Sequence, residues 1–544
     1  MRRLTFWKKR DLFRKKEIRE GKEIFSSFPE ASPLKIYDRD YWWSDAWDPT
    51  QYAQEIDFSR SFLEQVHELY KTIPYPSRSV RNLVRSDYCD QANDFKDCYL
   101  CFNGDHGEEC LYGVTFYTMR NSVDFFATNS CELCYELFSV GNSYKTAFAF
   151  ESSGCRDSWF LSDCGNLSNC VGCVNLSNKQ FHILNQPYSK EEYQDKLTEL
   201  DFGSYRKLTE FKQKFADFQK NFPVKYTHAF RTVNTVGEYV YDARNAYQCY
   251  EAVALENVAY VQSVATNVKD SYDYTNWGDN VELMYESVVC GDKCKGLKFC
   301  IDCWPACQDL EYCINCHSSA NLFGCVGLTK KEYCILNKQY SKEEYEALVP
   351  KLKEFMARMP YSDRRGVKYA YGEFFPAEFS PLAYNESAAP DYYPIDQKRI
   401  AELGFAWRET EQRGFEATIE AKDLPDHIKD VKDDILQQII KCGGCGRAYR
   451  VISSELEFYR RMGLPLPRLC YRCRYEERTK NRNRLKWYHR KCMCGGIKSE
   501  NGVYTNLTAH NHGADHCPIE MESAYAPERT EMIYCESCYQ IEVA

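Results

Sequence analysis

An internal duplication constrains the fold of this chain more than any single motif does. Residues 169–193 read NCVGCVNLSNKQFHILNQPYSKEEY, and residues 321–345 read NLFGCVGLTKKEYCILNKQYSKEEY. The two segments have the same length, and both end in YSKEEY. Weaker matches, such as ELCYE at 132–136 and ELMYE at 282–286, extend the duplication to about 93–200 and 241–352. The sequence therefore predicts two copies of one structural unit.

Small residues recur at regular intervals inside each copy. Cys89, Cys110 and Cys131 follow one another at an interval of about 21 residues, and Val281, Cys303 and Cys325 at one of about 22. Residues that stack in register at one spacing are typical of β-solenoids. We therefore predict a mainly β fold with some α: a duplicated β-solenoid of about 21–22 residues per coil with capping helices, plus C-terminal zinc ribbons.

A helix is expected after each copy. Ser189 with Glu192, and Ser341 with Glu344, have the S-x-x-E form of a capping box. The resulting domain prediction is a degenerate ribbon and helical region at 1–85, solenoid copies at 86–222 and 223–358, a linker or strap at 359–435, and a tandem zinc-ribbon domain at 436–544.

Composition narrows the functional classes. The chain has 544 residues, 29 cysteines and a net charge of −9, so no global attraction to nucleic acid or to an anionic membrane is expected. No apolar run approaches the ~20 residues of a spanning helix, and the basic N-terminus lacks the apolar core of a secretory signal. We predict a cytoplasmic protein whose thiols are reduced, and either bind metal or are buried.

Two C-x2-C pairs give the strongest chemical signal. Cys442 and Cys445 are followed, after 24 intervening residues, by Cys470 and Cys473. Two residues between thiolates let both reach one tetrahedral ion, and neighbouring glycines allow the tight turn. The spacing predicts a closed structural zinc site.

A second metal site is expected further along the chain. Its candidate ligands are Cys492, Cys494, Cys517, Cys535 and Cys538, with His489, His510, His512 and His516 nearby. Spacing does not decide which of Cys492, Cys494 and Cys517 join the Cys535/Cys538 pair, and a mixed His/Cys shell stays open. The expected cofactor is Zn²⁺, as one or two structural ions.

Two segments, 2–22 and 472–491, are rich in lysine and arginine. Basic residues interleaved with aromatic ones can contact phosphates and stack on bases. The alternative is a solvated helix, which is the usual role of a charge run. The nucleic-acid hypothesis names Arg474, Arg478, Lys480, Arg482, Arg484, Lys486 and Trp487.

Five further C-x2-C pairs lie in the two copies, at Cys98/Cys101, Cys131/Cys134, Cys170/Cys173, Cys300/Cys303 and Cys313/Cys316. They could bind zinc or an iron–sulfur cluster, or perform redox chemistry. The alternative is a buried ladder in which cysteine is a small filler, because serine and valine occupy equivalent positions.

The two ends of the chain are similar to each other. Residues 525–543 align with 28–47, and the basic segments that precede them also correspond. Asp38 and Tyr41 stand where Cys535 and Cys538 are in the C-terminal copy. The N-terminal copy is therefore predicted to bind no metal and to be held together by its aromatic residues.

These motifs together resemble a known family. The strings LEFYRRMGLPLPRLCYRCR (456–474), WYHRKCMC (487–494), SAYAPERTEMIYCESCYQ (523–540) and ILNKQYSKEEY resemble an uncharacterised cysteine-rich zinc-ribbon family associated with candidate-phylum bacteria. The resemblance covers most of the chain. It implies zinc binding and no known activity, and the N-terminal CxxC half of the family's ribbon is missing here.

No nucleotide-binding, nucleophile-elbow or metalloprotease motif is found in the sequence. We predict a zinc-binding structural or interaction scaffold with no evident catalytic activity. Protein and nucleic acid are both open as partners, no membrane partner is expected, and the sequence identifies no small-molecule substrate. One alternative is a nucleic-acid binder that uses the two basic segments. Another is a carbohydrate-active β-helix enzyme with acids such as Asp124, Asp157 and Asp163 on one face.

Overall fold

The computed structural model describes residues 1–264, 266–409 and 415–543, which form two compact units. Unit 1 consists of Met1–Ser79, Thr227–Thr410 and Arg484–Trp487, and unit 2 consists of Val80–Tyr226, Glu411–Asn483 and Tyr488–Ala544. Each unit therefore combines one copy of the duplicated region with one terminal part of the chain. The fold is mainly β with some helices, as predicted. The five-part domain division stays a prediction.

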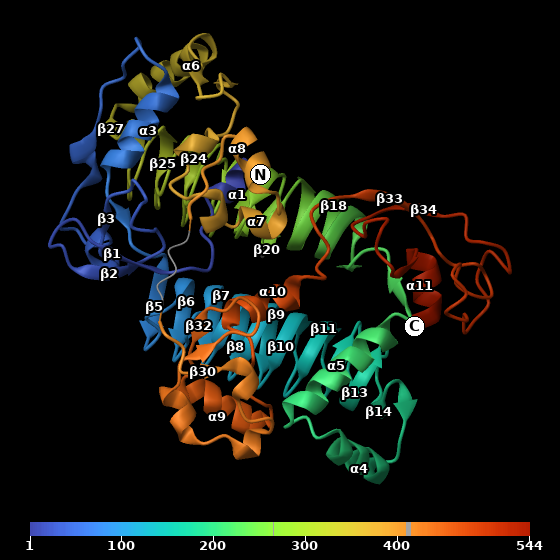
Figure 1. Cartoon of the computed structure of the whole chain (residues 1–544). Helices are drawn as coiled ribbons and strands as arrows, with labels where there is room; N and C mark the ends of the chain where they lie inside the picture. Colours follow the sequence, from blue (N-terminus) through green and yellow to red (C-terminus); the bar gives the residue numbers. More distant parts are fainter. Residues whose placement is uncertain (265, 410–414, 544) are drawn as a thin grey trace. The chain divides into compact units, whose positions relative to one another are not determined.

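Unit 2 is built around an eleven-stranded sheet whose strands pair in chain order (Figure 1). All neighbours from β5 to β14 are parallel, with Ala92 opposite Gly104 and Gly104 opposite Phe116. Side chains that stack between neighbouring strands are 12 residues apart, as Asn82 and Asp94 are. The strands are β5 (Val80–Val84), β6 (Asp90–Lys96), β7 (Phe102–Glu108), β8 (Leu111–Arg120), β9 (Val123–Glu132), β10 (Tyr135–Gly141), β11 (Ala147–Ser153), β12 (Trp159–Ser162), β13 (Ser168–Val174), β14 (Gln180–Ile183) and the antiparallel β15 (Gln186–Pro187).

Every third residue of this region is buried in one core. Its members include Cys89, Ala92, Phe95, Cys98, Cys101, Cys110, Phe116, Met119, Phe125, Cys131, Cys134, Leu137, Val140, Ala149, Cys155, Leu161, Cys164, Leu167, Cys170 and Cys173. Serines also occur at these interior positions, and their hydroxyl groups form hydrogen bonds with the backbone. The Ser122 hydroxyl donates to the Arg120 carbonyl (2.6 Å) and accepts from the Cys134 amide (3.1 Å). Small apolar and hydroxyl side chains therefore fill one continuous interior.

The sequence predicted a coil of about 21–22 residues. This prediction is wrong, because neighbouring strands pair with a much shorter offset. Side chains that stack between neighbouring strands are 11 to 13 residues apart. The interior position recurs at every third residue, and 21 is a multiple of three. Cys89, Cys110 and Cys131 therefore share the interior position although they do not stack on one another. In the second copy, one inserted residue between two interior positions changes their spacing from about 21 to about 22 residues.

The backbone turns at a left-handed residue just before most interior positions. Asn82, Asp94, Asp97 and Asn103 are examples, with φ between 53° and 55°. Asparagine and aspartate tolerate this conformation better than other residues with a side chain do. They also connect neighbouring strands, because the Asn82 amide donates to the Asp94 carboxylate at 2.7 Å.

Unit 1 contains the second copy, with the same parallel pairing. Its interior includes Cys249, Cys290, Cys300, Cys313 and Cys325. At the start of this copy the paired residues are 11 apart, as Ala229 and Val240 are. The 12-residue register of the first copy recurs where Tyr250 pairs with Gln262 and, at the end, where Gln308 pairs with Ala320. In the middle, Val268 pairs with Val281, and the stacked Asn267 and Asn280 are 13 residues apart. The middle of the copy therefore gains one residue at each repeat.

The strands of unit 1 are β1 (Phe13–Lys16), β2 (Glu23–Ser26), β3 (Ile36–Tyr37), β4 (Tyr75–Pro76), β17 (Ala229–Phe230), β18 (Val233–Ala259), β19 (Gln262–Val264), β20 (Thr266–Lys269), β21 (Tyr272–Thr275), β22 (Asp279–Glu282), β23 (Tyr285–Val288), β24 (Gln308–Glu311), β25 (Ala320–Phe323), β26 (Glu332–Ile335), β27 (Lys338–Gln339), β28 (Tyr361–Ser362) and β29 (Lys368–Tyr369). Its helices are α1 (Arg2–Thr5), α2 (Arg39–Trp42), α3 (Phe62–Thr72), α6 (Lys342–Arg358), α7 (Ala389–Tyr392) and α8 (Gln397–Glu402).

The twin segments end the parallel pairing in both units. The Asn185 side chain accepts from the Val174 amide and donates to the Val174 carbonyl, both at 2.9 Å. Asn337 makes the same two bonds to Val326, both at 2.8 Å. Each asparagine side chain thus bonds the backbone N–H and C=O groups that a further parallel strand would otherwise bond. The predicted capping boxes of Ser189 and Ser341 are present at α4 (Lys190–Leu200) and α6.

The remaining elements of unit 2 form its helical cover and its C-terminal module. They are α5 (Tyr205–Gln219), β16 (Pro223–Lys225), β30 (Ile419–Glu420), β31 (Ile440–Lys441), β32 (Ala448–Tyr449), α9 (Ser453–Met462), α10 (Tyr471–Thr479), β33 (Tyr488–Lys491), β34 (Glu520–Ser523), β35 (Met532–Tyr534) and α11 (Glu536–Val543). Within the described residues, no helix has both the length and the apolar character needed to cross a bilayer.

The N-terminal part of unit 1 repeats the C-terminal module of unit 2. An antiparallel hairpin, β1–β2 or β33–β34, precedes a short strand, β3 or β35, which pairs in parallel with β4 or β16. A helix follows in each unit. Asp38 caps α2 by accepting from the Asp40 amide (3.0 Å), and Tyr41 packs edge-on against Tyr37. In the N-terminal module, helix capping by Asp38 and aromatic packing by Tyr41 are therefore found where the C-terminal module has Cys535 and Cys538.

Candidate metal centres

The first cysteine group lies between a hairpin and a helix of unit 2. Cys442 and Cys445 follow β31, and Cys470 and Cys473 lie at the start of α10. The four sulfurs are all within 4.8 Å of one another, and Cys445 Sγ is 3.7 Å from Cys470 Sγ. Four sulfurs bound tetrahedrally at about 2.3 Å would be about 3.8 Å apart. The group therefore has the spacing of a single four-thiolate site.

The backbone around Cys442 favours its thiolate. The amides of Cys470 and Gly444 donate to Cys442 Sγ at 3.2 and 3.4 Å. Burial opposes ionisation, but these backbone N–H groups bring the pKa of Cys442 down to about 7. Gly446, with φ of 72°, provides the turn after Cys445. Cys445 is exposed, so the group lies at the surface of the unit.

The second group contains Cys492, Cys517, Cys535 and Cys538, and all four are buried. Cys492 follows β33, Cys535 follows β35 and Cys538 lies in the first turn of α11. The Sγ atoms of Cys517 and Cys535 are 3.9 Å apart, and the Cys535 amide donates to Cys492 Sγ (3.2 Å). The Cys492 thiol lowers the pKa of Cys535. These elements complete the Cys535/Cys538 pair with Cys492 and Cys517.

Cys494 lies in a third group instead, with His510, His512 and Cys538. Cys538 therefore belongs to both of the last two groups. His489 and His516 belong to neither. The His489 ring lies between Glu520 and Glu522 on the exposed hairpin, and the His516 ring is 3.7 Å from Glu500.

A fourth group consists of Asp94, Asp105 and His106. It was not predicted, because these residues do not have the sequence spacing that is typical of metal ligands. It lies on the partly exposed ladder of side chains along β6 and β7. Asn82 and Asn93 already donate to Asp94 and Asp105 at 2.7 Å, so the cross-strand ladder accounts for these carboxylates.

The C-x2-C pairs of the two copies lie in the interior of the parallel sheets. Two cysteines with this spacing occupy adjacent interior positions, as Cys131 and Cys134 do. In the described parts of the chain, none of these pairs belongs to a metal-ligand group. Cys101 Sγ donates to the Cys110 carbonyl at 3.3 Å. Among the interior cysteines outside these pairs, burial raises the pKa of Cys155 to about 11 and that of Cys249 to about 12. Within a pair the two thiols shift in opposite directions: the hydrogen bond with Cys134 lowers the pKa of Cys131, and burial raises the pKa of Cys134.

The basic segments supply partners for carboxylates of the two copies, which are largely buried in unit 2 and partly exposed in unit 1. In unit 2, Arg474 Nε lies 2.7 Å from Asp124, and Arg478 lies 3.5 Å from both Asp124 and Glu136. The Arg474 and Arg478 side chains are only 4% and 3% exposed. In unit 1, Arg3 contacts Asp273 at 2.9 Å and also pairs with Glu286. These arginines are engaged inside the protein and do not present a phosphate-binding surface.

The other residues of the nucleic-acid hypothesis lie in different surroundings. Arg482 is buried with its guanidinium 5.3 Å from the centre of the Phe126 ring. Lys480 pairs with Glu477 at 2.8 Å. Arg484, Lys486 and Trp487 lie in the short segment that belongs to unit 1. The predicted set is therefore divided between the two units.

The carboxylates of the carbohydrate hypothesis have separate surroundings. Asp124 is fully buried, and burial raises its pKa to about 6 against the opposing effect of the two arginines. Asp157 pairs with Lys145 at 3.2 Å. Asp163 accepts from the Ser162 hydroxyl at 2.9 Å. Asp124 has no solvent-exposed surface with which to reach a sugar.

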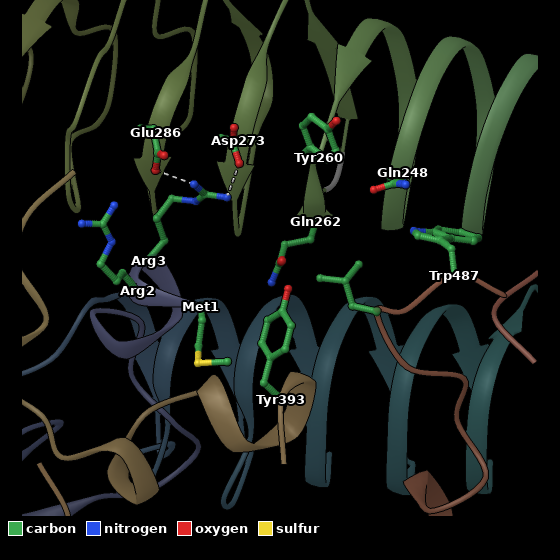
Figure 2. A pocket seen from close by; sticks show the side chains of 11 residues that line it. Met1, Arg2, Arg3, Gln248, Tyr260, Gln262, Asp273, Glu286, Tyr393 and Trp487 are labelled. Carbon is green, nitrogen blue, oxygen red and sulfur yellow. Dashed lines mark hydrogen bonds and ion pairs between the residues drawn. The ribbon is translucent and has the colours of Figure 1, made fainter. Parts of the chain in front are cut away.

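Unit 1 also contains a polar cavity of about 310 Å³ (Figure 2). Its lining includes Arg3, Gln248, Gln262, Tyr393 and Trp487. Gln262 is 5% exposed, and its Nε2 has no hydrogen-bond partner among the described residues. Arg3 extends towards Asp273 and Glu286, so its charge is already balanced. The cavity could accept a small polar molecule, with Gln262 as the donor.

Comparisons with known proteins add little. No family model matches the chain, and no curated protein matches it. Among solved structures, one similar chain is described as a putative acetyltransferase from Desulfovibrio desulfuricans G20. The two are 9% identical with a TM-score of 0.10, and the match covers 53% of this chain and 86% of the other. A likeness this weak carries no argument about function.

Proposed function

We propose that this protein is a zinc-binding interaction scaffold in which a duplicated β-solenoid carries metal-stabilised ribbons in unit 2. The observation that carries the proposal is the four-cysteine group at Cys442, Cys445, Cys470 and Cys473. Zinc suits four thiolates in a tetrahedron, and such a site leaves no coordination position for water. Its role is therefore to stabilise structure.

The solenoid part of the proposal rests on the parallel register and on the interior position at every third residue. Such a repeat gives each copy a long, regular outer surface, of the kind that repeat proteins use for binding. Arg474 and Arg3 are already paired with acids of the protein, which favours a protein partner over nucleic acid. All 29 cysteines are free, in keeping with a reducing, cytoplasmic setting.

The resemblance to the cysteine-rich zinc-ribbon family of candidate-phylum bacteria is part of the same proposal. The C-terminal strings that carry the resemblance include Cys470, Cys473, Cys535 and Cys538. Membership would explain both the ribbons and the duplicated YSKEEY segment.

Metal analysis of the purified full chain tests the proposal. We expect Cys445→Ser/Cys473→Ser to lose one zinc ion relative to the wild type. The matched control is Cys98→Ser/Cys101→Ser, which changes a C-x2-C pair of the parallel sheet and should keep the full complement. Equal zinc in all three proteins, or zinc lost from the control alone, would contradict the proposal.

A further inference from the structure

Seven potential metal ligands meet in the C-terminal module of unit 2. Cys492, Cys517, Cys535 and Cys538 form one group, and Cys494, His510, His512 and Cys538 form the other. Cys538 is common to both. We propose that this module binds two zinc ions joined by the Cys538 sulfur. The inference extends the proposed zinc binding, but it does not depend on the group at Cys442.

Counting donors explains why one sulfur must be shared. Two separate tetrahedral ions need eight ligand atoms, and the two groups supply five thiols and two imidazoles. If Cys538 Sγ binds both ions, the seven side chains make eight bonds. Each ion is then four-coordinate and closed to water, which makes the centre structural rather than catalytic.

The distances of the histidine group match zinc geometry. His510 Nδ1 lies 3.6 Å from Cys494 Sγ, and His512 Nε2 lies 3.4 Å from Cys538 Sγ. A nitrogen bound at about 2.0–2.1 Å and a sulfur bound at about 2.3 Å to one tetrahedral ion are about 3.6 Å apart. Together with the 3.9 Å between the sulfurs of Cys517 and Cys535, these separations suit one ion in each group.

Hydrogen bonds fix the ring protons away from the proposed ions. His510 Nε2 is 2.9 Å from Glu542 Oε1, and both side chains are fully buried. The Leu507 amide and the Tyr504 hydroxyl donate to the other oxygen of this carboxylate, Glu542 Oε2, both at 2.8 Å, so the carboxylate acts as an acceptor. His512 Nδ1 is 2.7 Å from the Asp515 carbonyl, which can only accept.

The free lone pairs of both rings are therefore directed at thiols. Nδ1 of His510 faces Cys494, and Nε2 of His512 faces Cys538. A carboxylate or carbonyl on the far nitrogen is the usual arrangement for a zinc-binding histidine. His489 and His516 are not directed at a thiol in this way, although they lie in the same stretch of sequence.

A second set of contacts holds Cys494 in place. Asn506 Nδ2 donates to Cys494 Sγ at 3.2 Å and to the Gly496 carbonyl at 2.7 Å. The Tyr534 hydroxyl donates to Asn506 Oδ1 at 2.8 Å, which orients the amide. Five thiolates and two Zn²⁺ ions leave one net negative charge, and an N–H donor to a sulfur stabilises that charge.

The experiment counts metal ions and detects the bridge in the full chain. Native mass spectrometry of the wild type should find three zinc ions, including one at the Cys442 group. His512→Ala should bind two, and Cys538→Ser should bind one because both ions of the centre lose a ligand. His516→Ala is the matched control and should bind three.

A measurement on the wild type avoids variants that fail to fold. After replacement of zinc by ¹¹³Cd, two of the cadmium resonances should show scalar coupling through Cys538 Sγ. The third resonance should disappear in Cys445→Ser/Cys473→Ser without affecting that coupling. Two zinc ions in the wild type, loss of only one ion in Cys538→Ser, or three uncoupled cadmium signals would overturn the proposal.

Discussion

At the scale of single residues, the same acid–arginine arrangement occurs in both units. Asp124 in unit 2 and Asp273 in unit 1 occupy matching places in the duplicated sequence, as do Glu136 and Glu286. The first pair faces Arg474 and Arg478, and the second pair faces Arg3. A charge buried without a partner is costly, so in unit 2, where these side chains are largely buried, Arg474 and Arg478 fix their segment on one particular place of the sheet.

The contact between Asp124 and Arg474 gives the first prediction. Asp124→Asn removes the carboxylate charge and leaves two buried guanidinium groups short of a partner. Breaking a buried pair in this way costs about 3–5 kcal/mol of unfolding free energy. The decrease in unfolding free energy is measured by a urea titration in which hydrogen exchange of the amides in residues 111–141 is the readout.

The exposed pair of Arg85 and Asp97 provides the control for that prediction. These side chains are 67% and 30% exposed, so Asp97→Asn should leave the unfolding midpoint unchanged. The double variant Asp124→Asn/Arg474→Gln should lose less than the sum of its single variants. Strictly additive losses would show that the two groups do not interact.

At the scale of elements, the parallel sheets depend on matching interior residues between repeats. Gly113 of β8 pairs with Phe125 of β9, and a Cβ at Gly113 would be 2.3 Å from the Phe125 ring. Gly113→Ala must therefore displace a buried aromatic side chain. Overpacking of this kind costs about 1–3 kcal/mol.

Thermal unfolding of Gly113→Ala and Gly165→Ala tests this packing. Gly165 lies in the same parallel repeat, but the nearest atom to its added Cβ is the Ser177 hydroxyl at 3.3 Å, which can rotate away. We expect a clear fall in melting temperature for Gly113→Ala and little change for Gly165→Ala. Equal effects at the two sites would contradict the packing argument.

The sequence predicted a mainly β fold with some helices, but not the spacing between stacked residues. The duplication and the capping boxes at Ser189 and Ser341 are local patterns, and they led directly to the correct elements. The period of three was concealed because its interior positions accept cysteine, phenylalanine, glycine and serine alike. A search restricted to small residues therefore found 21, a multiple of the true step.

The metal ligands show a similar limit. Cys442, Cys445, Cys470 and Cys473 could be grouped from spacing because each pair lies on one turn. The other ligands are brought together by the β33–β34 hairpin, β35 and α11. The spacing of cysteines and histidines along the sequence does not reveal how these elements are arranged in space. The sequence therefore offered Cys492, Cys494 and Cys517 as equal choices, which the structure separates into two groups.

At the scale of the whole molecule, the duplication includes the terminal modules as well as the sheets. Each unit contains a parallel sheet ended by an asparagine, a hairpin, and a short strand followed by a helix. The two units differ in chemistry. All the Cys/His groups found among the described residues lie in unit 2, whereas Asp38 and the aromatic residues around Tyr41 occupy the corresponding place in unit 1.

This difference predicts that metal removal affects the two units unequally. A structural ion contributes its binding free energy to folding, so a chelator should destabilise the part that binds it. After treatment with a strong zinc chelator, amides in 440–475 and 488–540 should lose protection from hydrogen exchange, while those in 285–335 should keep it. Restoring zinc should restore the protection. Parallel loss in unit 1, or no loss in unit 2, would contradict the assignment of metal binding to one unit alone.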